Sequence, residues 1–135
     1  MIKFSMAVLI ILLFVISGFV ADINAEQIKT EKGLFLIEVN IDKEVLRVGE
    51  IRSIKLIVRD AYGNGVDGAD IKATPWMTEH GHGSSKQTEV MGKEGGIYIV
   101  ENLYFTMKGK WDLIIEIKHK GKDDSALIPL PKVKL

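Results

Sequence analysis

The distribution of apolar side chains along the chain indicates β-strands rather than helices. From Leu34 onward, apolar positions alternate with a period of two far more often than they recur at the helical spacing of about 3.6. The clearest strand covers residues 54–59, in which Ile54, Leu56 and Val58 alternate with a second set directed toward solvent. Because successive side chains of a strand point to opposite faces, we expect these three to face a core.

Turn-forming residues divide this alternating region into about seven strands. Asn64-Gly65 and two further glycines mark residues 60–69 as a connection. Pro75 is expected to stop the strand before it, because proline has no N–H to donate to a ladder. A hairpin turn is expected at residues 121–124. The expected strands are residues 34–41, 54–59, 71–74, 89–91, 97–103, 111–119 and 126–130, with a further short one at 45–47. Two antiparallel sheets packed face to face accommodate such a set, so we expect an all-β, immunoglobulin-like antiparallel β-sandwich.

The beginning of the chain follows a different pattern. Residues 6–20 carry no charge and follow a short basic start, which is the layout of a signal peptide. An uncleaved membrane anchor is the alternative, because roughly 17 to 25 apolar residues can span a bilayer, and it would tether the protein through residues 4–21. We therefore expect residues 1–25 to be a signal peptide or anchor and residues 26–135 to form one domain. The protein is expected to be exported, to the periplasmic or extracellular face of a membrane.

Charge and cysteine content exclude several classes of function. The 18 basic residues balance the 18 acidic ones and give a formal net charge of +0. No overall field attracts a polyanion, so nucleic-acid binding is not expected. The chain has no cysteine, which removes disulfides, thiolate metal sites, a cysteine nucleophile and a lipidated cysteine. Any bound metal must therefore use histidine, methionine or carboxylate ligands.

One segment contains residue types that folding alone does not require. It lies in the least regular part of the expected domain, residues 76–86, and contains His80 and His82, two of the three histidines. In an extended chain these two side chains project to one side, and the glycines after each of them leave room for a ligand. The pattern therefore suggests a metal site. A polar surface turn without a metal is the alternative.

Methionines add soft donors to this segment. Met77 lies three residues before His80, and Met91 and Met107 are candidates that folding could bring near. Thioether sulfur selects Cu(I), whereas imidazole suits several metals, so the mixture favours copper over zinc. The alternative role for Met91 and Met107 is to fill gaps in the core. His119, near a strand end between two lysines, is interpreted as a solvated residue.

Catalysis is not expected. Glu79 and His80 are adjacent, so in a strand their side chains point to opposite faces and do not form an acid–base pair. The sequence contains no G-x-S-x-G motif, and the glycines of residues 63–68 lack the Gly-Lys-Ser/Thr ending of a phosphate-binding loop. We therefore predict a binding protein rather than an enzyme.

The order of short motifs along residues 51–130 resembles a known family. The motifs are Pro75-Trp76-Met77, His80-Gly81-His82-Gly83, Gly95-Gly96-Ile97-Tyr98 and Met107-Lys108-Gly109-Lys110-Trp111. Together they resemble the YtkA-like domain, which is related to the FixH-like proteins. The stretch from Val48 to Ala69 also resembles exported immunoglobulin-like domains, including copper-resistance sandwich proteins of the CopC type.

The resemblance implies an exported or membrane-tethered β-sandwich that handles copper or assists assembly of a copper-containing oxidase. By this resemblance Met77, His80 and His82 are metal ligands, and Met107 or Met91 would complete a Cu(I) site. Thr78-Glu79 stands where the family pattern is often richer in methionine. The expected function is copper capture or transfer, with a copper-accepting or envelope protein as partner. The alternative is an envelope interaction or structural module that binds no metal.

Overall fold

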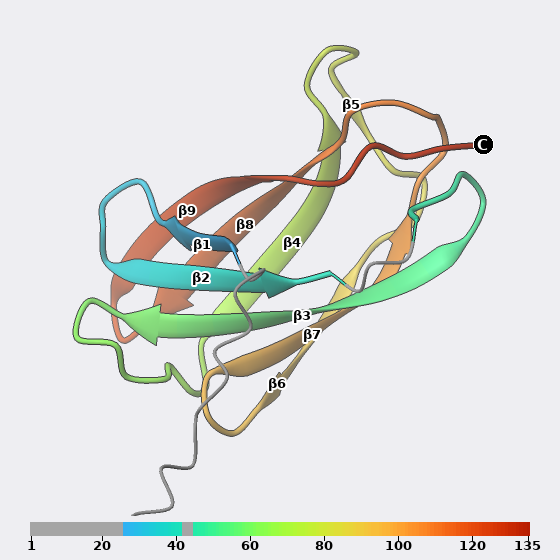
Figure 1. Cartoon of the computed structure of the whole chain (residues 1–135). Helices are drawn as coiled ribbons and strands as arrows, with labels where there is room; N and C mark the ends of the chain where they lie inside the picture. Colours follow the sequence, from blue (N-terminus) through green and yellow to red (C-terminus); the bar gives the residue numbers. More distant parts are fainter. Residues whose placement is uncertain (1–25, 42–44) are drawn as a thin grey trace, which may run out of the picture.

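Two antiparallel sheets pack face to face in the computed structural model, which describes residues 26–41 and 45–135 (Figure 1). One sheet contains β1 (Glu26–Lys29), β2 (Phe35–Asn40), β3 (Ile51–Asp60), β7 (Ile97–Tyr104) and β6 (Glu89–Lys93), in that order. The other contains β5 (His82–Gly83), β4 (Asp70–Met77), β8 (Asp112–His119) and β9 (Lys122–Pro129), also in spatial order. The described residues form no helix. The prediction of an immunoglobulin-like antiparallel β-sandwich is confirmed.

The apolar faces of the two sheets meet in one core, as the alternation predicts. Ile54, Leu56 and Val58 on β3 are buried, and Leu113 and Ile115 on β8 are buried in the facing sheet. Removing one such side chain from water contributes about 1.5–3 kcal/mol. The core therefore accounts for the period of two in both sheets.

The prediction that Pro75 ends its strand is wrong. β4 continues through Pro75 to Met77, and Pro75 pairs with Leu113 of β8. On its other side β4 pairs with the short β5 only at Trp76 and Met77. Pro75 therefore lies where β4 is still an edge strand, which is the position in a sheet that tolerates a missing N–H.

Other strand boundaries also differ from the prediction. Residues 45–47 form no strand, and Arg47 makes only an isolated bridge to Lys134. The turn expected at residues 121–124 is instead Lys120-Gly121, and β9 begins at Lys122. Both turn residues have positive φ, 48° for Lys120 and 75° for Gly121, as a two-residue hairpin requires. The short strands β1 and β5 were not predicted.

The predicted signal peptide or anchor, residues 1–25, lies outside the described residues. Within the described ranges, no helix is long and apolar enough to cross a membrane.

A buried carboxylate joins β9 to the turn between β1 and β2. Asp124 is only 6% exposed, and its carboxylate lies 2.6 Å from the Thr30 hydroxyl. The backbone N–H groups of Lys32, Leu34 and Ser125 donate to the same carboxylate at 2.9 to 3.1 Å. Burial by itself raises the pKa of Asp124, but these hydrogen bonds outweigh burial and hold the pKa below its ordinary value of 3.8. The charged form is therefore the one that the fold stabilises.

We expect Asp124 to make the stability depend on pH. A carboxylate whose pKa is lower in the folded state stabilises the protein above its unfolded pKa, and this contribution is lost as the pH falls through the folded pKa. Asp124→Asn should lower the free energy of unfolding at neutral pH by about 1–3 kcal/mol, because donors remain that the amide cannot all satisfy. It should also flatten the pH dependence below about pH 4. Chemical denaturation at neutral and acidic pH measures both effects.

The adjacent, exposed Asp123 provides the matched control. Asp123→Asn should change the free energy of unfolding by less than about 0.5 kcal/mol. Equal effects of the two substitutions would contradict the role given to Asp124.

Candidate metal-binding site

The two predicted histidine ligands lie in the hairpin that joins β4 to β5. Met77 pairs with His82 across this hairpin. The Met77 carbonyl accepts hydrogen bonds from the N–H groups of His80 at 3.1 Å and Gly81 at 2.8 Å. Residues 76–86, expected to be irregular, therefore contain the end of β4, an ordered turn and β5. This turn therefore fixes the backbone positions from which both imidazole side chains project.

The imidazole rings of His80 and His82 lie close together. Their centroids are 5.8 Å apart and their planes are inclined by 47°. Nδ1 of His82 lies 3.1 Å from the Gly83 carbonyl oxygen. Because a carbonyl can only accept, this hydrogen bond places the proton on Nδ1 and leaves the Nε2 lone pair available. Metal-bound histidines commonly orient their rings in this way. His80 is exposed and His82 is partly buried.

The buried Trp111 packs against the histidine hairpin. Its indole contacts the His82 ring edge-to-face at 6.0 Å between centroids, and the Phe105 ring at 5.2 Å. Its Nε1–H donates to the Met107 carbonyl oxygen at 2.9 Å. One buried side chain thus contacts the hairpin and holds the connection formed by residues 105–111. The two segments therefore lie at the same end of the sandwich, which places Met107 at the end that carries the histidines.

The three candidate methionines have different environments. Met77 is only 1% exposed, and its terminal methyl group packs against Gly109. Met107 is 40% exposed in the connection that Trp111 holds, and Met91 is 44% exposed on β6 in the other sheet. The interpretation of Met91 and Met107 as core residues is therefore wrong. Met107 is the accessible thioether at the end that carries the histidines.

Two further contacts at this end were not identified from the sequence. The Thr78 hydroxyl donates to Oδ2 of Asp112 at 2.6 Å and joins the hairpin turn to β8. The Gly83 carbonyl orients His82, as described above. In the part of the chain that the structure describes, no group of three or more histidine, aspartate or glutamate residues could hold a metal ion. A metal at this end would therefore need a thioether or an external ligand beside the two imidazoles.

We expect Gly109 to be essential for the packing of this end. It has a φ of 125°, and a Cβ at this position would come within 3.3 Å of the Met77 methyl group. Gly109→Ala should lower the free energy of unfolding through backbone strain of about 1–2 kcal/mol and additionally through crowding against Met77. Thermal or chemical denaturation measures the loss.

Gly49 is the matched control, because it also has a positive φ, 80°, but a Cβ there would meet nothing within 4 Å. Gly49→Ala should therefore cost less than Gly109→Ala. A cost at Gly109 no larger than that at Gly49 would show that the contact with Met77 is unimportant.

Comparisons with known proteins identify the family. Solved structures similar to this chain include the Lin-41 filamin domain and the ZirS C-terminal domain. The first is 17% identical with a TM-score of 0.49, and covers 73% of this chain and 91% of that domain. The second is 22% identical with a TM-score of 0.43, and covers 79% of this chain and 70% of that domain. At these values neither carries an argument about fold or function. No curated protein matches the chain.

The model of the YtkA-like family matches residues 36–116. This range runs from β2 into β8 and includes the histidine hairpin and the connection with Met107. It covers more than half of the chain and confirms the resemblance found in the sequence. The protein therefore belongs to the YtkA-like family.

Proposed function

We propose that this member of the YtkA-like family is an exported, non-catalytic protein that captures or transfers copper through His80 and His82. The observation that carries the proposal is the separation of the two rings. An imidazole nitrogen lies about 2.0 Å from a bound metal, so two rings that share one ion have centroids about 5–6 Å apart. The measured 5.8 Å falls in this range before any adjustment.

The chemistry of the donors favours copper, and Cu(I) in particular. Neutral imidazoles and a thioether form a soft ligand set, and the chain has no thiolate to compete with them. Met107 is the thioether that an incoming ion can reach, because it is exposed at the same end. Met77 is a less accessible donor, since its side chain is buried against Gly109.

The accessibility of the ligands favours exchange over storage. His80 is exposed on a four-residue turn, and Met107 is exposed on the neighbouring connection. Ligands on surface loops can pass a metal to another protein more readily than a buried cage can. A copper-accepting envelope protein is the partner that this arrangement suits. Export through residues 1–25, with or without a lasting tether, would place the site where such a partner meets it.

A copper titration tests the two histidines. The full chain in neutral detergent should bind one Cu(I) in competition with a colorimetric chelator. His80→Ala/His82→Ala should abolish this binding. Because the His82 ring packs against Trp111, thermal denaturation checks that the double variant is still folded at the temperature of the titration. His119→Ala is the matched control: its ring bonds to the Asp67 carbonyl oxygen at the other end of β8, so binding should be unchanged. If the wild-type protein binds no more tightly than the double variant, the copper proposal fails and the metal-free interaction module is the better function.

A second substitution tests the thioether. Met107→Leu keeps the size and apolar character of the side chain but removes the sulfur. It should weaken Cu(I) binding by about tenfold or more and leave Cu(II) binding nearly unchanged, because only the softer ion prefers sulfur. The same titrations with both oxidation states measure the difference. Equal Cu(I) affinity of the variant and the wild-type protein would remove Met107 from the site and leave the histidines as the ligands.

A further inference from the structure

The last residues of the described chain are held between two loops at the end that carries the histidines. Val133 is 1% exposed and exchanges two backbone hydrogen bonds of 2.9 Å with Gly109. Lys134 bonds through its backbone to Leu46 at 2.9 Å and to Val48 at 2.8 Å. This segment is therefore part of the folded domain, and its side chains have fixed neighbours.

This arrangement concentrates basic side chains. The antiparallel bridge between Gly109 and Val133 brings their flanking residues toward one another, Lys108 toward Lys134 and Lys110 toward Lys132. Arg47 also bridges to Lys134, in a parallel sense. All five basic side chains are exposed. We call Arg47, Lys108, Lys110, Lys132 and Lys134 the basic cluster.

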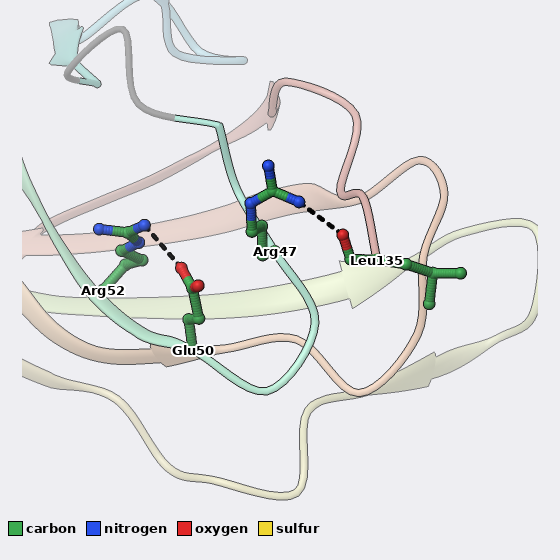
Figure 2. A network of polar contacts seen from close by, with 4 residues as sticks. All are labelled: Arg47, Glu50, Arg52 and Leu135. Carbon is green, nitrogen blue, oxygen red and sulfur yellow. Dashed lines mark hydrogen bonds and ion pairs between the residues drawn. The ribbon is translucent and has the colours of Figure 1, made fainter.

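Within the described residues, no side-chain carboxylate neutralises the basic cluster. Arg47 donates to the carbonyl oxygen of Leu135 at 2.6 Å, and the nearby Glu50 pairs with Arg52 at 2.6 Å (Figure 2). The four lysines make no ion pair to a described carboxylate. Like charges that face one another across a bridge repel, so an anionic surface placed over the basic cluster would relieve this repulsion.

The opposite end of the sandwich also contains lysines, but acidic residues lie among them. There, Lys118 is paired in register with both Asp70 and Asp123. Basic and acidic residues are thus interspersed at that end. The basic cluster thus differs from Lys118 at the opposite end, because its lysines lie opposite other basic residues and not opposite acidic ones.

Exposed apolar side chains adjoin the basic cluster. Met107 precedes Lys108 and is 40% exposed, and Leu135 follows Lys134 and is 77% exposed. Surfaces that lie on anionic membranes combine basic residues with apolar side chains that enter the headgroup region. An acidic protein segment would be recognised by the charges alone and gains less from these two side chains. The combination favours a lipid surface.

We propose that the basic cluster docks on an anionic lipid surface, with Met107 and Leu135 entering the headgroup region. Docking places the end with His80 and His82 next to the membrane. The proposal does not require copper, so the two proposals can fail separately.

Lysine footprinting of the full chain tests the docking. Acetylation rates are measured by mass spectrometry with phosphatidylcholine vesicles, with and without phosphatidylglycerol. Phosphatidylglycerol should slow the acetylation of Lys108, Lys110, Lys132 and Lys134 several-fold and leave Lys118, Lys120 and Lys122 unchanged. High salt should reverse the protection, because it screens exposed charges. Equal acetylation rates in both kinds of vesicle, or uniform slowing at both ends of the sandwich, would overturn the proposal. Protection by polyglutamate but not by vesicles would also overturn it and would identify an acidic protein partner instead.

A pair of variants gives an independent test. Lys108→Gln/Lys134→Gln relieves like-charge repulsion and should fold normally. It should reduce the protection of Lys110 and Lys132 severalfold in phosphatidylglycerol vesicles. Lys120→Gln/Lys122→Gln removes the same charge at the other end and should leave that protection unchanged. Equal effects of the two double variants would show that only net charge matters and would overturn the assignment to the basic cluster.

Discussion

The contact between Trp111 and Phe105 governs the whole end of the sandwich that carries the histidines. Phe105 directly follows β7 in the five-stranded sheet, and Trp111 directly precedes β8 in the four-stranded sheet. Their edge-to-face packing therefore spans the point where the chain passes from one layer to the other. Such pairs contribute about 0.5–1.5 kcal/mol beyond the area that they bury. The His82 ring lies against the same indole, and the Nε1–H of Trp111 fixes the connection that binds the C-terminal segment.

Alternation predicted the interior of the sandwich well, because burial on one face of a strand is a local property of the sequence. It identified the faces of β3 and β8 and the fold class. The ends of the strands could not be predicted in this way, because they depend on pairing with neighbouring strands, which alternation does not reveal. Pro75 lies within β4 because β5 is too short to require its N–H. The turn at Lys120-Gly121 was predicted too late in the chain, because a lysine, rather than asparagine or glycine, occupies the first of its two positive-φ positions. β1 contains one apolar residue among four and gives almost no pattern.

The candidate site was predicted in part for a related reason. The spacing of His80 and His82 is local, and the hairpin that places their rings together needs only a short segment. Burial of the methionines is a tertiary property. The sequence could not show that Met77 packs under Gly109 whereas Met107 faces solvent, because an aromatic residue lies within two positions before each of them, Trp76 and Phe105. The Met-x-Gly-x-Trp motif held the missing information, since Gly109 admits the Met77 methyl group and Trp111 supports the hairpin.

The proposed metal site and the basic cluster share one end of the sandwich, so the charges around the two histidines bear on which ion they would hold. Two imidazoles and a thioether would bring no negative charge to offset a bound cation. The lysines of the basic cluster would raise the electrostatic cost of such a cation over the screening length of about 8–10 Å in physiological salt, whereas the Asp112 carboxylate, bonded to Thr78 of the hairpin, would lower it. Ligand softness, rather than charge, is therefore the main reason to favour Cu(I) over Cu(II) or zinc. An anionic surface that neutralises the lysines would lower the cost further. If both proposals hold, copper binding and docking would be thermodynamically coupled, and by reciprocity each would strengthen the other by the same factor.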